Sequence, residues 1–296
     1  GKTLLAETLA RRLDVPFLVA DATVLTEAGY VGEDVESLIQ RLLQICDNDV
    51  QRAAHGIVYL DEVDKLAVRH TMNHSRDVSG EGVQQALLRF MEGTVVRLVP
   101  RGRGAAHRLG LLEVDTRHIL FICGGAFEGL AQLIERRRHQ HGTGFTACVS
   151  EAYRSSNLLA HAEAADLIRY GMIPEFVGRL PIVAVLDPLD ADALVRILTE
   201  PANALVRQYG KLFAMEGCEL RFTPGALRAV AQEALARGTG ARGLRTVIER
   251  VLLEPMYWLP RQSKAQCLTI DEDAVRDGSS RNAGPVTGHY RCSIRS

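Results

Sequence analysis

IVYLDEVD, residues 57–64, is the stretch that predicts the fold. Four apolar residues in a row are typical of a strand buried on both faces of a parallel sheet. The run ends in Asp61 and Glu62, and open α/β sheets bind ligands at the carboxyl ends of their strands. We therefore expect these two acidic side chains to line a binding site. A strand that merely ends in a solvated acidic turn is the alternative.

GKT, residues 1–3, indicates which ligand the site takes. These residues, directly before a helical pattern, match the end of a phosphate-binding loop, whose full form is G-x-x-x-x-G-K-[ST]. There Lys2 reaches the phosphates, the Thr3 hydroxyl ligates Mg²⁺, and the helix N-terminus attracts negative charge. Asp61 then holds Mg²⁺ through a water, and Glu62 polarises an attacking water. An ordinary helix start is the alternative for GKT alone.

Apolar patterning predicts two domains. Buried strands are predicted at 16–20, 56–60, 119–123 and 182–186, and helices at 3–13, 35–46, 83–91 and up to about 138. Alternating strands and helices indicate a doubly wound parallel α/β domain. Helical patterns at 193–210, 224–236 and 243–253, with one strand at 267–270, predict a smaller helical domain. We expect domains at 1–188 and 189–276, and a disordered tail at 277–296 because apolar periodicity is weak there.

The composition is that of a soluble globular protein. The chain has 296 residues, 47% of them hydrophobic, and a net charge of −1, so no global field attracts nucleic acid or an anionic membrane. Six scattered cysteines without a C-x-x-C pair argue against zinc and against disulfides. No apolar run approaches the length of a membrane span. We expect a cytoplasmic protein without zinc. The run Arg136–His141 is interpreted as a solvated helix end.

Five further motifs follow one another along the chain. They are GYVGEDVE (29–36), RDVSGEGVQQALL (76–88), ILFICGGAF (119–127), IPEFVGRLP (173–181) and TGARGLR (239–245). Together with GKT and IVYLDEVD, this ordered series resembles the ClpX family of AAA+ ATPases, hexameric protein unfoldases that feed the ClpP peptidase. The resemblance runs from residue 1 to about residue 260. The related HslU unfoldases share the general pattern, but DVSGEGVQQALL favours the ClpX type.

The resemblance implies an AAA+ P-loop domain with a helical lid, the cofactors ATP and Mg²⁺, and a homo-hexamer. It assigns nucleotide binding to Gly1, Lys2, Thr3, Asp61 and Arg242, the metal to Thr3 and Asp61, and catalysis to Glu62 and to Arg179, an arginine finger offered to a neighbouring subunit. Arg245 competes with Arg242 as the lid arginine. AAA+ proteins often carry a polar sensor residue after the fourth strand. Here Cys123-Gly124-Gly125 stands at that place, so no sensor is assigned.

The resemblance also implies loops for substrate and partner. Tyr30 and Val31, between two glycines, match the pore loop that grips unfolded or tagged polypeptides. Arg76, Asp77, Val78 and Ser79 match a second pore loop, with a charged capping loop as the alternative. Thr143-Gly144-Phe145 stands where the family's peptidase-docking loop usually has Ile-Gly-Phe. The polar Thr143 weakens an apolar anchor, which puts docking to a ClpP-type peptidase in doubt.

Two functions remain open from the sequence. The first is an ATP-dependent protein unfoldase that threads polypeptides through a hexameric pore, and the intact Asp61–Glu62 pair favours it. The second is a non-hydrolysing or degenerate ring subunit that acts by binding. The absence of the glycine-rich loop head before Gly1, and Thr143, favour the second. We expect the chain to be cut at its start, before which the family carries a zinc-binding domain. A nucleic-acid-remodelling ATPase is disfavoured by Tyr30 in its Gly-flanked loop and by the neutral charge.

Overall fold

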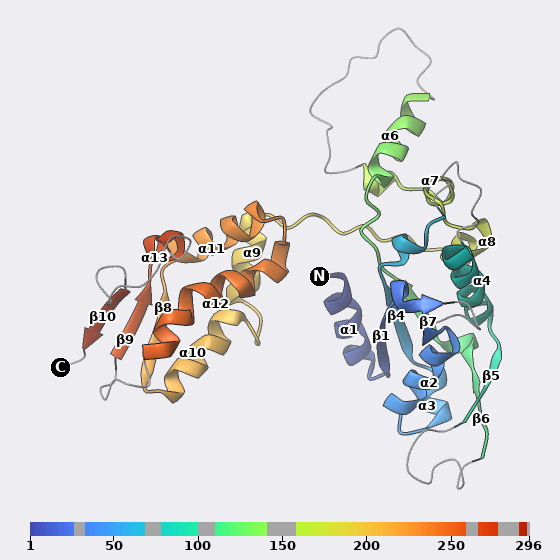
Figure 1. The fold of residues 1–296 in the computed structure, drawn as a ribbon, viewed down its shortest axis with the longest axis horizontal. Coiled ribbons are helices and arrows are strands. Elements are labelled where there is room, and N and C mark those ends of the chain that lie inside the picture. The colour runs from blue at the N-terminus through green and yellow to red at the C-terminus, as the bar shows by residue number, and fades with distance from the viewer. Residues whose placement is uncertain are drawn as a thin grey trace. The chain divides into compact units, whose positions relative to one another are not determined.

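The computed structural model describes residues 1–26, 33–68, 78–99, 110–140, 158–258, 266–277 and 290–294. The chain divides into two compact units, Gly1–Leu186 and Asp187–Ser296 (Figure 1). Each unit has an apolar core of its own. The first unit contains the predicted parallel α/β sheet and the second is mainly helical, so the predicted fold class is confirmed.

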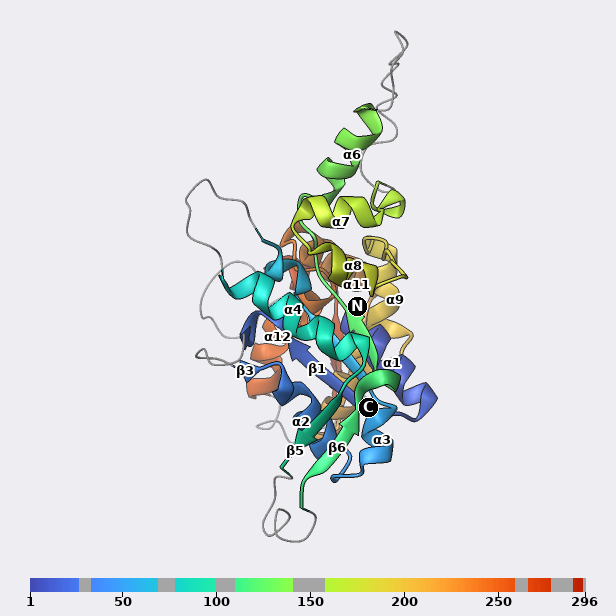
Figure 2. The ribbon, with the colours of Figure 1, turned by 90° about the vertical axis from the view of Figure 1, so that its right-hand side faces the viewer.

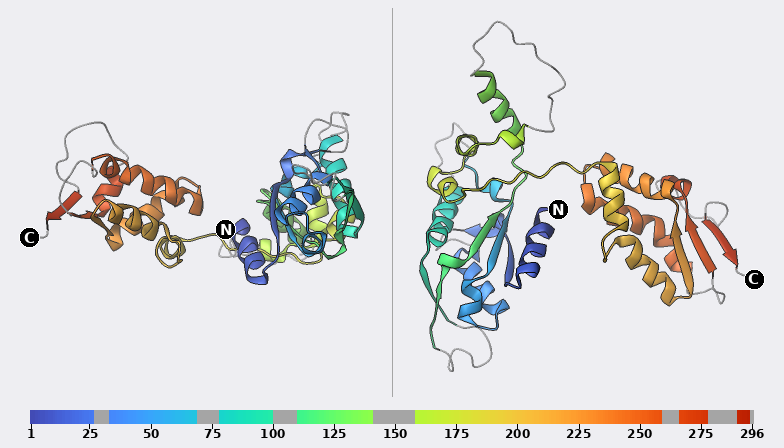
Figure 3. Two further views of the ribbon diagram at one scale, coloured as in Figure 1. Left: turned by 90° about the horizontal axis from the view of Figure 1, so that it is seen from below. Right: turned by 180° about the vertical axis from the view of Figure 1, so that it is seen from behind.

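The sheet of the first unit places the acidic motif at its centre. Its three parallel strands are β1 (Phe17–Asp21), β4 (Ile57–Asp61) and β7 (Leu120–Cys123), in the order β1-β4-β7. As predicted, β4 is buried from Ile57 to Leu60 and reaches intermediate exposure only at Asp61. Helix α1 (Lys2–Leu13) lies along one side of this sheet, and α2 (Glu36–Ile45) and α4 (Val78–Glu92) lie on the other (Figures 1 and 3).

Shorter elements complete the first unit. They are η1 (Ala22–Val24), β2 (Leu25–Thr26), β3 (Glu33–Asp34), α3 (Val50–Ala54), η2 (Val63–Leu66), β5 (Val95–Leu98), β6 (Leu112–Asp115), η3 (Thr116–His118), α6 (Leu130–Gln140), η5 (Leu159–His161), α7 (Ala164–Tyr170) and α8 (Pro174–Gly178). Helix α7 packs across the base of α6, whose far end extends away from the sheet (Figure 2). Strands β5 and β6 form an antiparallel pair.

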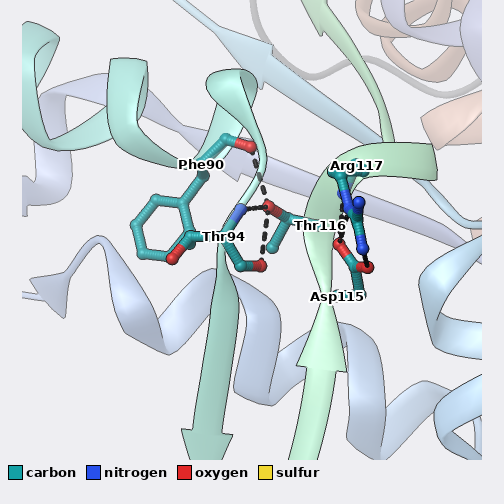
Figure 4. A network of polar contacts seen from close by, with 5 residues as sticks. All are labelled: Phe90, Thr94, Asp115, Thr116 and Arg117. Carbon is teal, nitrogen blue, oxygen red and sulfur yellow. Dashed lines mark hydrogen bonds and ion pairs between the residues drawn. The ribbon is translucent and has the colours of Figure 1, made fainter.

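A buried threonine joins α4, β5 and η3 (Figure 4). The Thr116 hydroxyl donates to the Phe90 carbonyl and accepts from the Thr94 N–H, each at 2.9 Å. Beside it, Arg117 donates to the Asp115 carboxylate, and this hydrogen bond lowers the pKa of Asp115 to about 2. Satisfying a buried hydroxyl at the end of α4 fixes how this helix meets the β5–β6 pair.

Helix α1 forms where it was predicted, but its leucines do not face the sheet. Ala6 and Ala10 are the buried residues of this helix, because they lie toward β1 and β4. The four leucines of the periodic pattern are exposed: Leu4, Leu5, Leu9 and Leu13. Small side chains at the contact let the helix approach the strands closely.

The strand predicted at 182–186 is wrong. Residues 180–190 form neither helix nor strand, and Ile182 is 84% exposed. A strand buried in a parallel sheet needs hydrogen-bonded neighbours. Within the described residues, β7 pairs with β4 alone, and no strand pairs with 182–186. Apolar composition alone therefore did not decide the structure of this segment, whose backbone forms no strand ladder with the described chain.

The second unit is a helical layer with a small sheet. Its elements are α9 (Ala191–Thr199), α10 (Leu205–Met215), β8 (Cys218–Phe222), α11 (Pro224–Ala236), α12 (Gly240–Trp258), β9 (Gln266–Ile270), α13 (Glu272–Asp277) and β10 (Tyr290–Ile294). The single helix predicted at 193–210 is wrong, because the helix is interrupted around Pro201, which lacks an N–H and restricts the preceding residue. Within the tail expected to be disordered, β10 pairs antiparallel with β9.

No helix in the described ranges combines the length and apolar character that crossing a bilayer requires.

Candidate functional site

Asp61 is the last residue of β4, and its carboxylate faces the start of α1. Its Oδ1 accepts from the Tyr59 hydroxyl at 3.2 Å and from the Glu62 N–H at 3.1 Å. Its Oδ2 faces the Thr3 hydroxyl at 3.4 Å, a loose contact for two oxygens. GKT and IVYLDEVD, more than fifty residues apart in the sequence, thus meet at the carboxyl end of the sheet. The apolar run before Asp61 had placed the acidic pair at this end.

The oxygen donors at this place fit Mg²⁺. One carboxylate and one hydroxyl, from Asp61 and Thr3, are hard ligands of the kind that Mg²⁺ takes while keeping several waters. Among the described residues, no group of three or more His, Cys, Asp or Glu side chains could hold a metal on its own. A site with so few protein ligands suits a metal that is shared with a phosphate-bearing ligand.

Glu62 follows in an uncommon backbone conformation. Its φ is 57° and its ψ 32°, the left-handed region that a residue with a Cβ rarely adopts. This turn sends the chain from β4 into η2 and leaves the Glu62 side chain exposed. The Val63 N–H then donates to the Gly124 carbonyl at 3.0 Å, which ties the turn to β7. Strain of this kind gathers at functional sites.

Two side chains from the β4 region fill the space beside Gly124 and Gly125. A Cβ on Gly124 would lie 2.2 Å from the Tyr59 hydroxyl, and one on Gly125 would lie 2.4 Å from the Asp64 carboxylate. Asp64 is buried, and it accepts the N–H groups of Ala126 and Phe127 at 3.2 and 3.3 Å. The glycine pair after β7 is therefore required by packing. Sequence reasoning noted the glycines but missed Tyr59 and Asp64.

Cys123, at the end of β7, is not a nucleophile in this arrangement. Burial raises the pKa of its thiol to about 12, so the thiol stays protonated at neutral pH. The chemistry of the site therefore rests on its oxygens.

A buried glutamine connects the acidic turn to the segment that carries Arg179. The Gln84 side chain, fully buried on α4, donates to the Leu66 carbonyl at 2.8 Å and accepts from the Ile173 N–H at 2.9 Å. Leu66 ends η2, directly after the acidic motif, and Ile173 caps α8. These two hydrogen bonds explain why a polar residue, Gln84, is buried within the QQALL pattern. The sequence alone could not predict this role, because it does not show that the segments of Leu66 and Ile173 lie on either side of α4.

Arg179 follows α8 and forms an exposed ion pair. Its Nη2 lies 2.8 Å from Oε1 of Glu92, at the end of α4, and the two side chains are 51% and 47% exposed. Within the first unit, no interaction between Arg179 and Asp61 or Glu62 is found among the described residues. The guanidinium is held at the surface, where a ligand or a partner could reach it.

The second unit distinguishes the two candidate lid arginines. Arg242 lies in the first turn of α12, is exposed, and makes no ion pair within the described residues. Arg245 lies one turn on and pairs with Glu249 at 3.3 Å, while Glu249 also accepts from the Tyr209 hydroxyl. A cation at a helix N-terminus opposes the helix dipole, so Arg242 stays there at a cost to stability.

The predicted substrate and docking loops fall mostly outside the described residues. Tyr30 and Val31 lie between β2 and β3, in the range 27–32 that is not described. Arg76 and Asp77 are likewise outside, and Val78 and Ser79 are the first residues of α4. The docking residues Thr143, Gly144 and Phe145 lie in the undescribed range 141–157.

Comparison with known proteins identifies the family. The family model of the AAA domain (Cdc48 subfamily) matches residues 1–183, which is more than half of the chain. The chain belongs to the AAA family. In keeping with this assignment, the model of the C-terminal, D2-small domain of ClpB protein matches residues 189–267 of this AAA protein.

A relative refines the assignment within the AAA family. The ATP-dependent Clp protease ATP-binding subunit ClpX 3 of Methylococcus capsulatus is 55% identical over 294 residues, which cover 97% of this chain. The predicted resemblance to ClpX is thereby confirmed, and the chain is a ClpX-like AAA+ protein. It spans 66% of the length of that relative.

Proposed function

We propose that this chain is the ATPase part of a ClpX-type protein unfoldase. The observation that carries the proposal is the meeting of Thr3 with Asp61, followed by Glu62, at the carboxyl end of β4. ATP would bind at Gly1, Lys2 and Thr3, where the N-terminus of α1 offers free N–H groups to phosphate. The AAA family and the printed name of the relative, an ATP-binding subunit of an ATP-dependent protease, support nucleotide use.

Thr3 and Asp61 would hold Mg²⁺ together with the phosphates. Bound there, the metal would neutralise charge that develops on the transferred phosphoryl group. Residues of the chain orient the Asp61 carboxylate before any metal binds. Two hydrogen bonds hold Oδ1 of Asp61, so Oδ2 and the Thr3 hydroxyl would be the pair offered to the metal and the nucleotide.

Glu62 would orient and deprotonate the attacking water. Its side chain is exposed and follows Asp61 directly, and this would bring it near a water beside a phosphate bound at α1. General-base catalysis of this kind contributes about 10²- to 10⁴-fold in rate. Arg179 would act on the nucleotide of a neighbouring subunit, where an arginine finger contributes about 10³- to 10⁵-fold. Arg242, exposed and free of an ion pair in the described part of the second unit, would contact phosphate from the lid.

The finer parts of the proposal concern assembly and substrate. We infer a cytoplasmic homo-hexamer whose pore loops, with Tyr30 and Val31 in the first and residues 76–79 in the second, pull unfolded or tagged polypeptides. Delivery to a ClpP-type peptidase would use Thr143-Gly144-Phe145, and the polar Thr143 would weaken an apolar anchor there. The printed name of the relative, a Clp protease subunit, supports such a partner.

Measuring ATP hydrolysis tests the core of the proposal. Three proteins are compared: the chain itself, the chain preceded by a strand and glycine-rich loop head taken from the ClpX 3 relative, and the latter with Glu62→Gln as the blank. The extended chain should hydrolyse ATP, and the blank should bind ATP without turnover. If the extended chain forms hexamers and binds ATP but does not hydrolyse it, the alternative of a non-hydrolysing ring subunit replaces the proposal.

A further inference from the structure

We propose that Tyr59 is a positioning residue for the Asp61 carboxylate, and that its hydroxyl fills the space that a side chain at position 124, directly after β7, would need. The inference rests on the proposed ATPase function, because Asp61 is the proposed metal-binding carboxylate. It adds a residue to this site that the motif comparison did not assign.

The Tyr59 hydroxyl is buried and points at the site. The residue is 2% exposed and lies on β4, two positions before Asp61, so both side chains lie on the same face of the sheet. Its hydroxyl donates to Oδ1 of Asp61 at 3.2 Å. An aromatic ring of this size needs no hydroxyl to fill a core, so the polar end is better explained by its contact with the carboxylate.

The two hydrogen bonds to Asp61 act on the same oxygen. Oδ1 accepts from the Tyr59 hydroxyl and from the Glu62 N–H, while Oδ2 faces Thr3. With one oxygen held twice, rotation about the Cβ–Cγ bond is restricted and Oδ2 keeps its direction. A ligand oriented in advance binds a metal more tightly than one that must be ordered on binding.

The Tyr59 hydroxyl also restricts which residue can follow β7. A Cβ on Gly124 would lie 2.2 Å from this hydroxyl and 2.8 Å from Cζ of the same ring. The backbone at Gly124 cannot move aside easily, because its N–H donates to the Leu60 carbonyl at 2.7 Å and its carbonyl accepts from the Val63 N–H at 3.0 Å. A side chain at position 124 is therefore excluded, and the Tyr59 hydroxyl of β4 occupies this place beside Asp61.

Tyr59→Phe tests the proposal, because it removes the hydroxyl and keeps the ring. The matched control is Tyr209→Phe in the second unit, where the hydroxyl donates to the Glu249 carboxylate at 2.9 Å. Both variants are made in the extended chain of the hydrolysis assay. Two quantities are measured: the Mg²⁺ concentration for half-maximal ATP hydrolysis, and the affinity for Mn²⁺ in the presence of ADP, followed by electron paramagnetic resonance. Thermal unfolding of each variant is recorded alongside.

Tyr59→Phe should raise the half-maximal Mg²⁺ concentration and weaken Mn²⁺ binding about 3- to 10-fold, the effect of one hydrogen bond. At saturating Mg²⁺, kcat should stay within about twofold of the parent, since the nucleophile and its base are unchanged. The control should leave the metal dependence where it was. An unchanged metal dependence in Tyr59→Phe, or an equal shift in both variants, would overturn the proposal. A parent that binds Mn²⁺ and ADP but does not hydrolyse ATP overturns only the proposed function, because the Mn²⁺ comparison still decides the role of Tyr59.

Discussion

Glu62 combines a chemical role with a backbone conformation that disfavours its residue type. At φ 57° its Cβ is crowded, and a residue in this region costs about 1–2 kcal/mol relative to the right-handed one. Two hydrogen bonds hold the turn. The Glu62 N–H donates to the Asp61 carboxylate, and the Val63 N–H donates to the Gly124 carbonyl. The surrounding structure therefore keeps the Glu62 backbone in the left-handed region, which glutamate disfavours, and this lowers the stability of the protein.

The first prediction separates these two properties of Glu62. Asn tolerates the left-handed region better than Glu, whereas Gln does not. Glu62→Asn should therefore raise the free energy of unfolding by about 0.5–1 kcal/mol relative to Glu62→Gln. Made in the extended chain, both variants should lose about 10²- to 10⁴-fold in ATP turnover and keep ATP binding. Urea denaturation of both variants, with hydrolysis and nucleotide binding measured in the same buffers, provides the comparison. Equal stability of the two variants would show that the turn carries no strain.

The sequence predicts part of this site. Asp61 and Glu62 could be placed at the carboxyl end of a buried strand because four apolar residues precede them, and the structure puts them there. Tyr59 could not be assigned, since in the sequence it is one more member of the apolar run. Its role depends on how closely β7 approaches β4, which is a property of the packed sheet. Arg179 was found by its motif, but its pairing with Glu92 needs the distance between two helices.

At the scale of elements, one arginine of a basic run connects two helices. The run from Arg136 to Arg138 was interpreted as solvated, which is wrong for Arg137. This side chain is 14% exposed and donates two hydrogen bonds to the fully buried Asp166 at the start of α7, at 2.9 and 3.0 Å. It also reaches Glu163 and the His161 carbonyl. The hydrogen bond to Asp166 raises the pKa of Arg137, so the guanidinium stays charged.

The second prediction compares neighbouring arginines of α6. Arg137→Met should destabilise the protein by about 3 kcal/mol, because it leaves the Asp166 carboxylate buried without its cation. Arg136→Met is the matched control, since Arg136 is exposed and should change stability by less than about 0.5 kcal/mol. Chemical denaturation of the two variants measures the difference. Similar losses in both would contradict the assignment of Arg137 as the contact between α6 and α7.

Strands could be predicted where an apolar run also has a strand to pair with. Runs at 16–20, 56–60 and 119–123 became β1, β4 and β7, because each finds a parallel neighbour. The run at 182–186 is also apolar and forms no strand, since no strand of the described residues pairs with it. β10 is the opposite case, because a segment with little periodicity pairs with the edge of β9. Local composition cannot distinguish these outcomes.

At the scale of the whole molecule, the proposed catalytic residues divide between cis and trans roles. Asp61 contacts Thr3 of α1, and Val63, directly after Glu62, donates to the Gly124 carbonyl of the same unit, so Asp61 and Glu62 would act on a nucleotide bound in their own unit. Arg179 is half exposed and its ion pair with Glu92 is of the surface type, which contributes about 0–1 kcal/mol. Releasing this guanidinium to another acceptor therefore costs little. An arginine held so weakly is suited to a site completed by a second copy of the chain.

The third prediction tests this division by mixing subunits in the extended chain. Glu62→Gln and Arg179→Ala should each abolish hydrolysis alone, because every site in the ring then lacks one group. In a 1:1 mixture that assembles at random, about one quarter of the interfaces should join an intact Glu62 to an intact Arg179 from its neighbour, and the mixture should regain up to about a quarter of the parent rate. The double variant mixed with either single variant is the control, since no interface in those mixtures contains both groups in the trans arrangement. If Arg179 instead acts within its own subunit, the mixture of single variants stays inactive, because no subunit carries both groups. Recovery near a quarter thus assigns Arg179 to the neighbouring site, and the absence of recovery in mixed hexamers shows that Arg179 acts within its own subunit.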